Sequence, residues 1–203
     1  MINRYSSLFL PTNEIQKMQN CLVSTIFIFI ENRLVAIGGL YDRGSVEVIN
    51  ERKKIICNVD SLPYAFSYDS YHSSATVIPT GILVCGGDLH IANKCHLYKK
   101  TTSSWHSFPS MTMSRQFFDM KFLNQGIWAV GGTKALDNNG GRRNTLDHFD
   151  LKERVWTRHD IPIHVHAHCL TKLTHDKLIV IGGDYSREYR TYDERVREMT
   201  KIF

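Results

Sequence analysis

Four short apolar runs recur along the chain, and each of them ends in a pair of glycines. The runs are residues 34–37, 82–85, 127–130 and 178–181, and the pairs begin at Gly38, Gly86, Gly131 and Gly182. A second apolar run precedes each of them across a short turn such as Pro79-Thr80-Gly81, which is typical of a β-hairpin. Continuous apolar runs of this length indicate strands that are covered on both faces. The pattern predicts an all-β chain in which each glycine pair ends an inner strand.

The hairpins repeat at a nearly constant interval, because the glycine pairs lie 48, 45 and 51 residues apart. A period of about 45–50 residues is typical of the blades of a β-propeller. In such a blade, glycine allows the backbone of one inner strand to approach its neighbour closely. Large side chains seven positions apart follow in each repeat, most clearly Tyr98 with Trp105 and Phe149 with Trp156. We expect both tryptophans to be buried between neighbouring blades.

A proline follows the large side chains in three repeats, and with the glycine and aromatic pairs it makes the chain resemble the kelch-repeat family. The resemblance covers almost the whole chain. It implies one domain, residues 1–203, folded as a kelch-type β-propeller of about four four-stranded blades. Residues 5–11 look like an outer strand of a further blade, and kelch propellers usually close with six or seven blades. The sequence leaves open a small closed ring, part of a larger ring, or blades completed by another chain.

The resemblance also implies that one end of the propeller contacts a partner. Arg115 either binds a carboxylate there or has a structural role in hydrogen bonding to carbonyl groups between blades. Gln116 and Phe117 follow it, and by position their counterparts are Tyr71 with His72 and Ala167 with His168. Loops after the glycine pairs are expected at the same end. The predicted contact residues are Tyr41, Tyr71, His72, Asp88, His90, Arg115, Gln116, Phe117, His168, Asp184 and Tyr185.

Three histidines, His164, His166 and His168, would share one face of a strand. Three is the number of protein ligands in many catalytic zinc sites. Counted back from the glycine pair, however, His166 takes the place of Arg115, where kelch proteins often carry arginine or histidine around a central pocket. No carboxylate lies nearby in the sequence to orient the rings. We expect a polar, partly exposed cluster with neither a metal nor a cofactor.

Composition restricts the classes of partner. The net charge of +5 has no block of like charges, so we expect no nucleic-acid binding. Residues 21–30 are the most apolar stretch, but they are too short to cross a bilayer and fit an inner strand, so no membrane association is expected. The five cysteines, Cys21, Cys57, Cys85, Cys95 and Cys169, lack metal or disulfide spacing. Buried free thiols at Cys85 and Cys169 would favour a reducing compartment and a cytoplasmic location.

The chain carries no phosphate-binding loop, nucleophile elbow or HExxH motif, and no pair of carboxylates stands out. The resemblance therefore favours a non-catalytic interaction module, a scaffold or an adaptor of the kind that selects substrates for ubiquitin ligases. The expected partner is another protein, together with self-association or completion of the propeller by further blades. The alternative is a metal-dependent oxidase or a sugar-modifying enzyme, for which the histidine cluster and Tyr41, Tyr71 and Tyr185 are the candidate residues.

Overall fold

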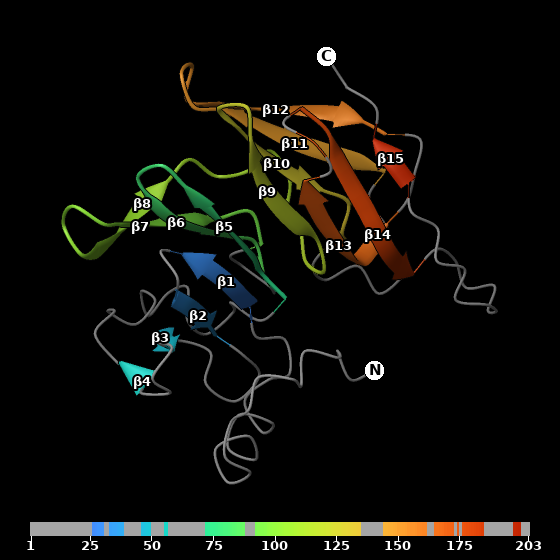
Figure 1. Ribbon diagram of the computed structural model, residues 1–203. Coiled ribbons are helices and arrows are strands. Elements are labelled where there is room, and N and C mark those ends of the chain that lie inside the picture. The colour runs from blue at the N-terminus through green and yellow to red at the C-terminus, as the bar shows by residue number, and fades with distance from the viewer. Residues whose placement is uncertain are drawn as a thin grey trace, which may run out of the picture.

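The computed structural model describes residues 26–30, 33–38, 46–49, 55–56, 72–87, 92–134, 144–161, 165–172, 174, 176–184 and 197–199. Every regular element in these residues is a β-strand, which confirms the predicted all-β class for this part of the chain (Figure 1). The strands form four antiparallel sheets, and within each sheet the spatial order follows the chain order.

The four sheets divide the chain as the glycine repeat predicts. The first contains β1 (Ile26–Ile30), β2 (Arg33–Ile37), β3 (Val46–Ile49) and β4 (Ile55–Ile56). The second contains β5 (Ser74–Ile78), β6 (Gly81–Cys85), β7 (Cys95–Lys99) and β8 (Ser104–Phe108). The third contains β9 (Asp119–Leu123), β10 (Gly126–Val130), β11 (Thr145–Asp150) and β12 (Val155–Asp160). The fourth contains β13 (His166–Lys172), β14 (Leu178–Asp184) and β15 (Arg197–Met199), so the described residues give it three strands, not the expected four.

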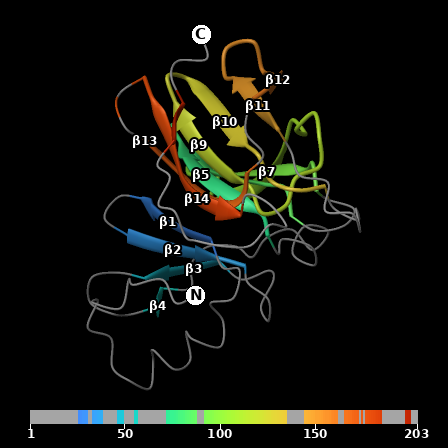
Figure 2. The ribbon, with the colours of Figure 1, turned by 90° about the vertical axis from the view of Figure 1, so that its right-hand side faces the viewer.

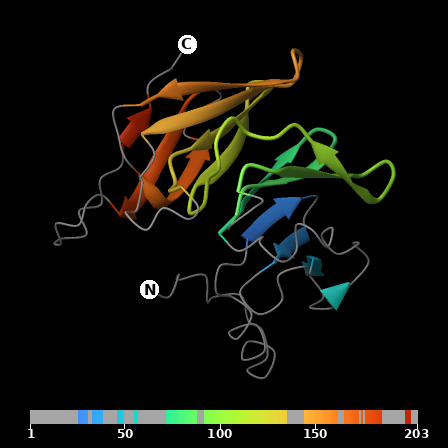
Figure 3. The same ribbon diagram turned by 180° about the vertical axis from the view of Figure 1, so that it is seen from behind.

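The inner strands of successive sheets lie side by side. β1 contacts β5, β5 contacts β9, and β9 contacts β13. The sheets therefore follow one another in an arc, with the first sheet at one end and the fourth at the other (Figures 1 and 3). Figure 2 shows the same array from the side, with the first sheet (blue) below the others. This arrangement is consistent with a propeller-like fold, and the described residues show no closed ring.

The glycine pairs end β2, β6 and β10, as predicted. Gly38, Gly86 and Gly131 all have a positive φ, of 63°, 71° and 63°. A Cβ atom on Gly86 would lie 2.6 Å from the carbonyl oxygen of Arg115, just before the third sheet, and a Cβ atom on Gly131 would meet the carbonyl oxygen of Val165, just before the fourth. These two glycines therefore allow close approach between sheets. The prediction is wrong for the fourth repeat. β14 continues through its glycines to Asp184, because residues of β13 pair with Gly182 and Asp184.

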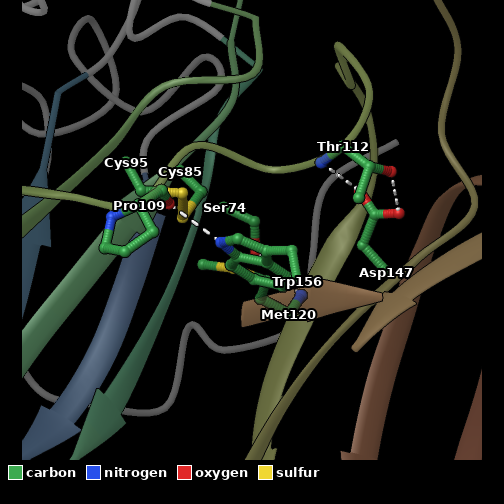
Figure 4. Close-up of a disulfide and its surroundings, with 8 residues drawn as sticks. All are labelled: Ser74, Cys85, Cys95, Pro109, Thr112, Met120, Asp147 and Trp156. Carbon is green, nitrogen blue, oxygen red and sulfur yellow. Dashed lines mark hydrogen bonds between the residues drawn. A yellow bond between two sulfur atoms is a disulfide. The ribbon is translucent and has the colours of Figure 1, made fainter. Parts of the chain in front are cut away.

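Apolar side chains fill the boundaries between successive sheets. Three clusters of buried residues lie between the first and second, the second and third, and the third and fourth sheets. Trp156 is 7% exposed in the middle cluster and its indole N–H donates to the carbonyl oxygen of Pro109 at 2.8 Å, as expected for a buried tryptophan (Figure 4). Trp105 is only half-buried against the first cluster, so its predicted burial is confirmed in part.

The cysteines differ from the prediction. Cys85 on β6 lies directly opposite Cys95 on β7, and the two form a disulfide (Figure 4). Their spacing of ten residues gave no indication of this, because antiparallel pairing across the loop is what brings them together. Cys169 is free but exposed, not buried as predicted. These two findings remove the observations from which a reducing compartment was predicted.

The part of the chain that the structure describes contains no helix with the length and apolar character needed to cross a membrane.

Candidate functional site

Three residues at equivalent places bend the chain as it enters the inner strands. His72, Phe117 and Ala167 have φ values of 62°, 54° and 51°, which is uncommon for residues other than glycine. The N–H of Phe117 donates to the carbonyl oxygen of His72 at 3.1 Å, and the N–H of Ala167 donates to that of Phe117 at 2.7 Å. These three residues, here called the central turns, form a hydrogen-bonded chain across the second, third and fourth sheets. Left-handed residues held in this way often mark functional sites.

The central turns correct the predicted correspondence in the fourth repeat. Ala167, not His168, is the counterpart of Phe117. Val165, not His166, is the counterpart of Arg115, because Gly132 donates to the carbonyl oxygen of Val165 as Gly87 donates to that of Arg115. The hairpin between β13 and β14 is one residue longer than the hairpin between β9 and β10, so counting back from the glycine pair gives a register that is wrong by one.

Two of the predicted contact residues form an aromatic pair at the central turns. The rings of His72 and Phe117 lie with their centroids 3.5 Å apart at an angle of 32°, and both residues are half-buried. Gln116 precedes Phe117 and pairs with Thr133, the two residues exchanging backbone hydrogen bonds of 3.1 and 2.9 Å. The site therefore combines a rigid backbone with partly exposed ring surface and a neighbouring amide side chain.

His168 lies beside this pair but is turned into the protein. Both of its ring nitrogens are buried, and neither has a hydrogen-bond partner among the described residues. A Cβ atom on Gly131 would lie 3.2 Å from its Cε1, so the ring packs against the glycine turn of the third sheet. Burial, and then the neighbouring charge of His166, lowers the pKa of His168 to about 4. His168 is therefore neutral at pH 7.

The structure does not assemble the predicted histidine cluster as a metal site. Among the described residues, no group of three or more histidine, cysteine, aspartate or glutamate side chains is placed to hold a metal ion. His164 lies outside these residues. Ala167 between His166 and His168 has a left-handed φ, so simple strand alternation does not apply here, but His166 lies close enough for its charge to act on His168.

Arg115 has the structural role, not the contact role. Its guanidinium is fully buried and donates to the carbonyl oxygens of Gly131 at 2.6 Å and Thr145 at 3.0 Å. It also lies 3.4 Å from a carboxylate oxygen of Asp147, which accepts two hydrogen bonds from Thr112 (Figure 4). These bonds hold the glycine turn and β11 within one sheet, whereas bonds between sheets were expected. No surface of Arg115 remains for a partner.

Asp119 is a central residue that the sequence interpretation missed. Its carboxylate accepts hydrogen bonds from the Ser74 hydroxyl at 3.0 Å, the Met120 amide at 2.7 Å and the Leu170 amide at 2.6 Å. It therefore joins the second, third and fourth sheets. Burial raises its pKa, and the three hydrogen bonds oppose that effect. A carboxylate as the first residue of an inner strand was the sequence feature that could have identified it.

The other predicted contact residues are not assembled by the described structure. Asp184 ends β14, where it pairs with His166 of β13. The remaining five lie outside the described residues: Tyr41, Tyr71, Asp88, His90 and Tyr185. The site that the structure places is thus His72, Gln116 and Phe117, whereas His168 packs against Gly131.

Comparison of the chain with protein-family models and with curated proteins gives no match. The kelch resemblance therefore rests on the residues of this chain alone. The fold and the central turns define a class of structure, an all-β array of repeated antiparallel sheets, without identifying a family.

Proposed function

We propose that this chain is a kelch-type propeller module that binds another protein without catalysis, through the end of the array at which His72, Gln116 and Phe117 lie. In this proposal the four sheets are blades, and the module acts as a scaffold or as an adaptor that recruits substrates, for example to a ubiquitin ligase. The observation that carries it is the close, tilted ring pair of His72 and Phe117 on hydrogen-bonded left-handed turns.

The aromatic pair has the properties of an interface anchor. Aromatic side chains contribute a large share of the free energy of binding at protein interfaces. An anchor whose backbone is already fixed loses little conformational entropy on binding. The chain of hydrogen bonds through Phe117 fixes that backbone in three sheets at once.

A cytoplasmic location belongs to the same proposal. The disulfide between Cys85 and Cys95 argues against it, because structural disulfides are rare in reducing compartments. Counting free thiols in protein isolated from its native compartment decides between the two.

Affinity purification with matched variants tests binding at the central turns. The test variant is His72→Ala with Phe117→Ala, which removes both rings. The control is His106→Ala with Val155→Ala, which removes one histidine and one exposed apolar side chain from outer strands. Proteins enriched by the wild type and by the control should be lost from the test variant, while its thermal unfolding stays the same.

Two results would overturn the proposal. Retention of the same proteins by the test variant would exclude the central turns as the binding site. Stoichiometric zinc or copper in the purified protein, lost on changing His166 and His168, would favour the enzyme class instead.

A further inference from the structure

Each end of the sheet array presents exposed apolar side chains. On β1, Phe27 and Phe29 alternate with Ile28, which packs against the second sheet, and they are 42% and 68% exposed. On β14, at the other end, Ile181 is 43% exposed, and Cys169, its partner on β13, is exposed too. Figures 1 and 3 show these two sheets at opposite ends of the arc. Exposed apolar patches of this kind mark surfaces that bind another protein.

The exposed face of the first sheet is the kind of face that receives a preceding sheet. Phe27 pairs with Ala36 as Met120 pairs with Ala129, so Phe27 and Met120 occupy equivalent positions. Met120 is fully buried in the cluster between the second and third sheets. We call this side of a sheet its rear face.

The exposed face of the fourth sheet is the opposite kind. Ile181 pairs with Cys169 as Val130 pairs with Asp119, so Ile181 and Val130 are equivalent. Val130 is fully buried in the cluster between the third and fourth sheets. We call this side of a sheet its forward face. The array thus ends in one rear face and one forward face, which are the two halves of a boundary that it already forms three times.

A polar contact found at one of the existing boundaries is also available at these ends. At the boundary of the second and third sheets, the Thr76 hydroxyl accepts a hydrogen bond of 3.1 Å from the amide of Phe122. Thr171 on β13 holds the position of Thr76, and Phe29 on β1 holds that of Phe122. A fourth sheet placed against a first sheet would therefore bring a threonine hydroxyl to the amide of Phe29.

We propose that the forward face of the fourth sheet in one copy of the chain binds the rear face of the first sheet in a second copy. Because one chain carries both faces, two copies make this contact twice around a twofold axis. The result is a closed ring of two four-sheet arrays, which lies within the usual range of propeller sizes. The inference goes beyond partner binding at the central turns and does not depend on it.

A second copy fits these faces better than closure within one chain. The three existing boundaries are densely packed, with Val84, Met120, Ile127 and Leu146 among their fully buried residues. Bringing the fourth sheet onto the first within one chain would change the angle at every boundary and break this packing. A second copy covers both faces and leaves the boundaries as they are.

Sedimentation of the full 203-residue chain with two charge variants tests the proposal. Phe29→Glu blocks the rear face, and Ile181→Lys blocks the forward face. Both sites are exposed, so we expect each variant to fold, which circular dichroism and thermal unfolding would verify. Val155→Lys is the matched control, because Val155 is 50% exposed on β12, away from both faces.

The wild type and the control should sediment at twice the 23.4 kDa of one chain, and each blocked variant as a monomer. An equimolar mixture of the two blocked variants should recover the dimer. In that mixture one contact joins two unaltered faces, and the other brings a glutamate near a lysine. The mixture also shows that both variants are folded.

Three results would overturn the proposal. A monomeric wild type at tens of micromolar would mean that no second copy covers the faces. A dimer that persists in either single variant would exclude a contact between forward and rear faces. Species larger than a dimer that grow with concentration would exclude the closed twofold ring.

Discussion

Acidification should destabilise the folded chain through His168. Burial and the neighbouring His166 lower the pKa of its ring to about 4, whereas an unfolded chain restores the ordinary value near 6.5. The folded state therefore binds this proton less tightly than the unfolded state does. The free energy of unfolding is therefore not reduced by this group above pH 6.5, and it decreases as the pH falls from 6.5 to 4. Between pH 7.5 and pH 5 the loss from this one group is about 2 kcal/mol, by the linkage relation.

The measurement is urea unfolding at both pH values for the wild type and for His168→Phe, which keeps a flat ring but cannot titrate. The difference between the two proteins isolates His168, because every other titrating group is present in both. The comparison is needed because Asp119 acts with the opposite sign. Burial raises the pKa of Asp119, so its protonation in acid favours the folded state. His106→Phe on β8 controls for the loss of a histidine elsewhere. Equal losses of stability in the wild type and His168→Phe would refute the burial argument.

Three further changes should lower the free energy of unfolding, as measured by urea denaturation at pH 7.5. Arg115→Met should cost about 3–5 kcal/mol because it leaves the buried carboxylate of Asp147 without its cation, and a cost below about 1 kcal/mol would contradict that role. Trp156→Ala should cost about 3–5 kcal/mol, and a water-like fluorescence maximum for this residue would show it exposed. Replacing Cys85 and Cys95 together by alanine should cost about 2–3 kcal/mol, and alkylation of the wild type without reduction should leave both cysteines unmodified.

The hairpins and their glycine turns could be predicted from sequence because each is a local pattern with one physical cause. An apolar run must be covered, and Gly86 must allow the third sheet to approach. The register of the fourth repeat could not be predicted, since one additional residue in its hairpin turn moves every position upstream of it. Because of that shift, His168 was predicted to be the counterpart of Phe117, whereas Ala167 is the counterpart in the structure.

The contacts that join distant parts of the chain could not be predicted from the sequence either. Cys85 and Cys95 meet because of strand pairing, and no spacing rule describes that. Asp119 contacts residues 45 and 51 positions away, so its role depends on how three sheets meet. The repeat predicted that His72 and Phe117 lie at equivalent places, and the structure brings their rings together. The burial of Arg115 could not be predicted, because it depends on hydrogen bonds within the third sheet.

At the central turns, the conformation of the backbone does not depend on which side chain it carries. The same backbone bend carries an imidazole at His72, a benzyl group at Phe117 and a methyl group at Ala167, so the bend makes no demand on the side chain. The hydrogen bonds that link these turns use only backbone atoms. A substitution at any of the three changes what the surface presents while leaving the bonds that hold it. These three positions can therefore accept other side chains without loss of the backbone bonds that hold the turns.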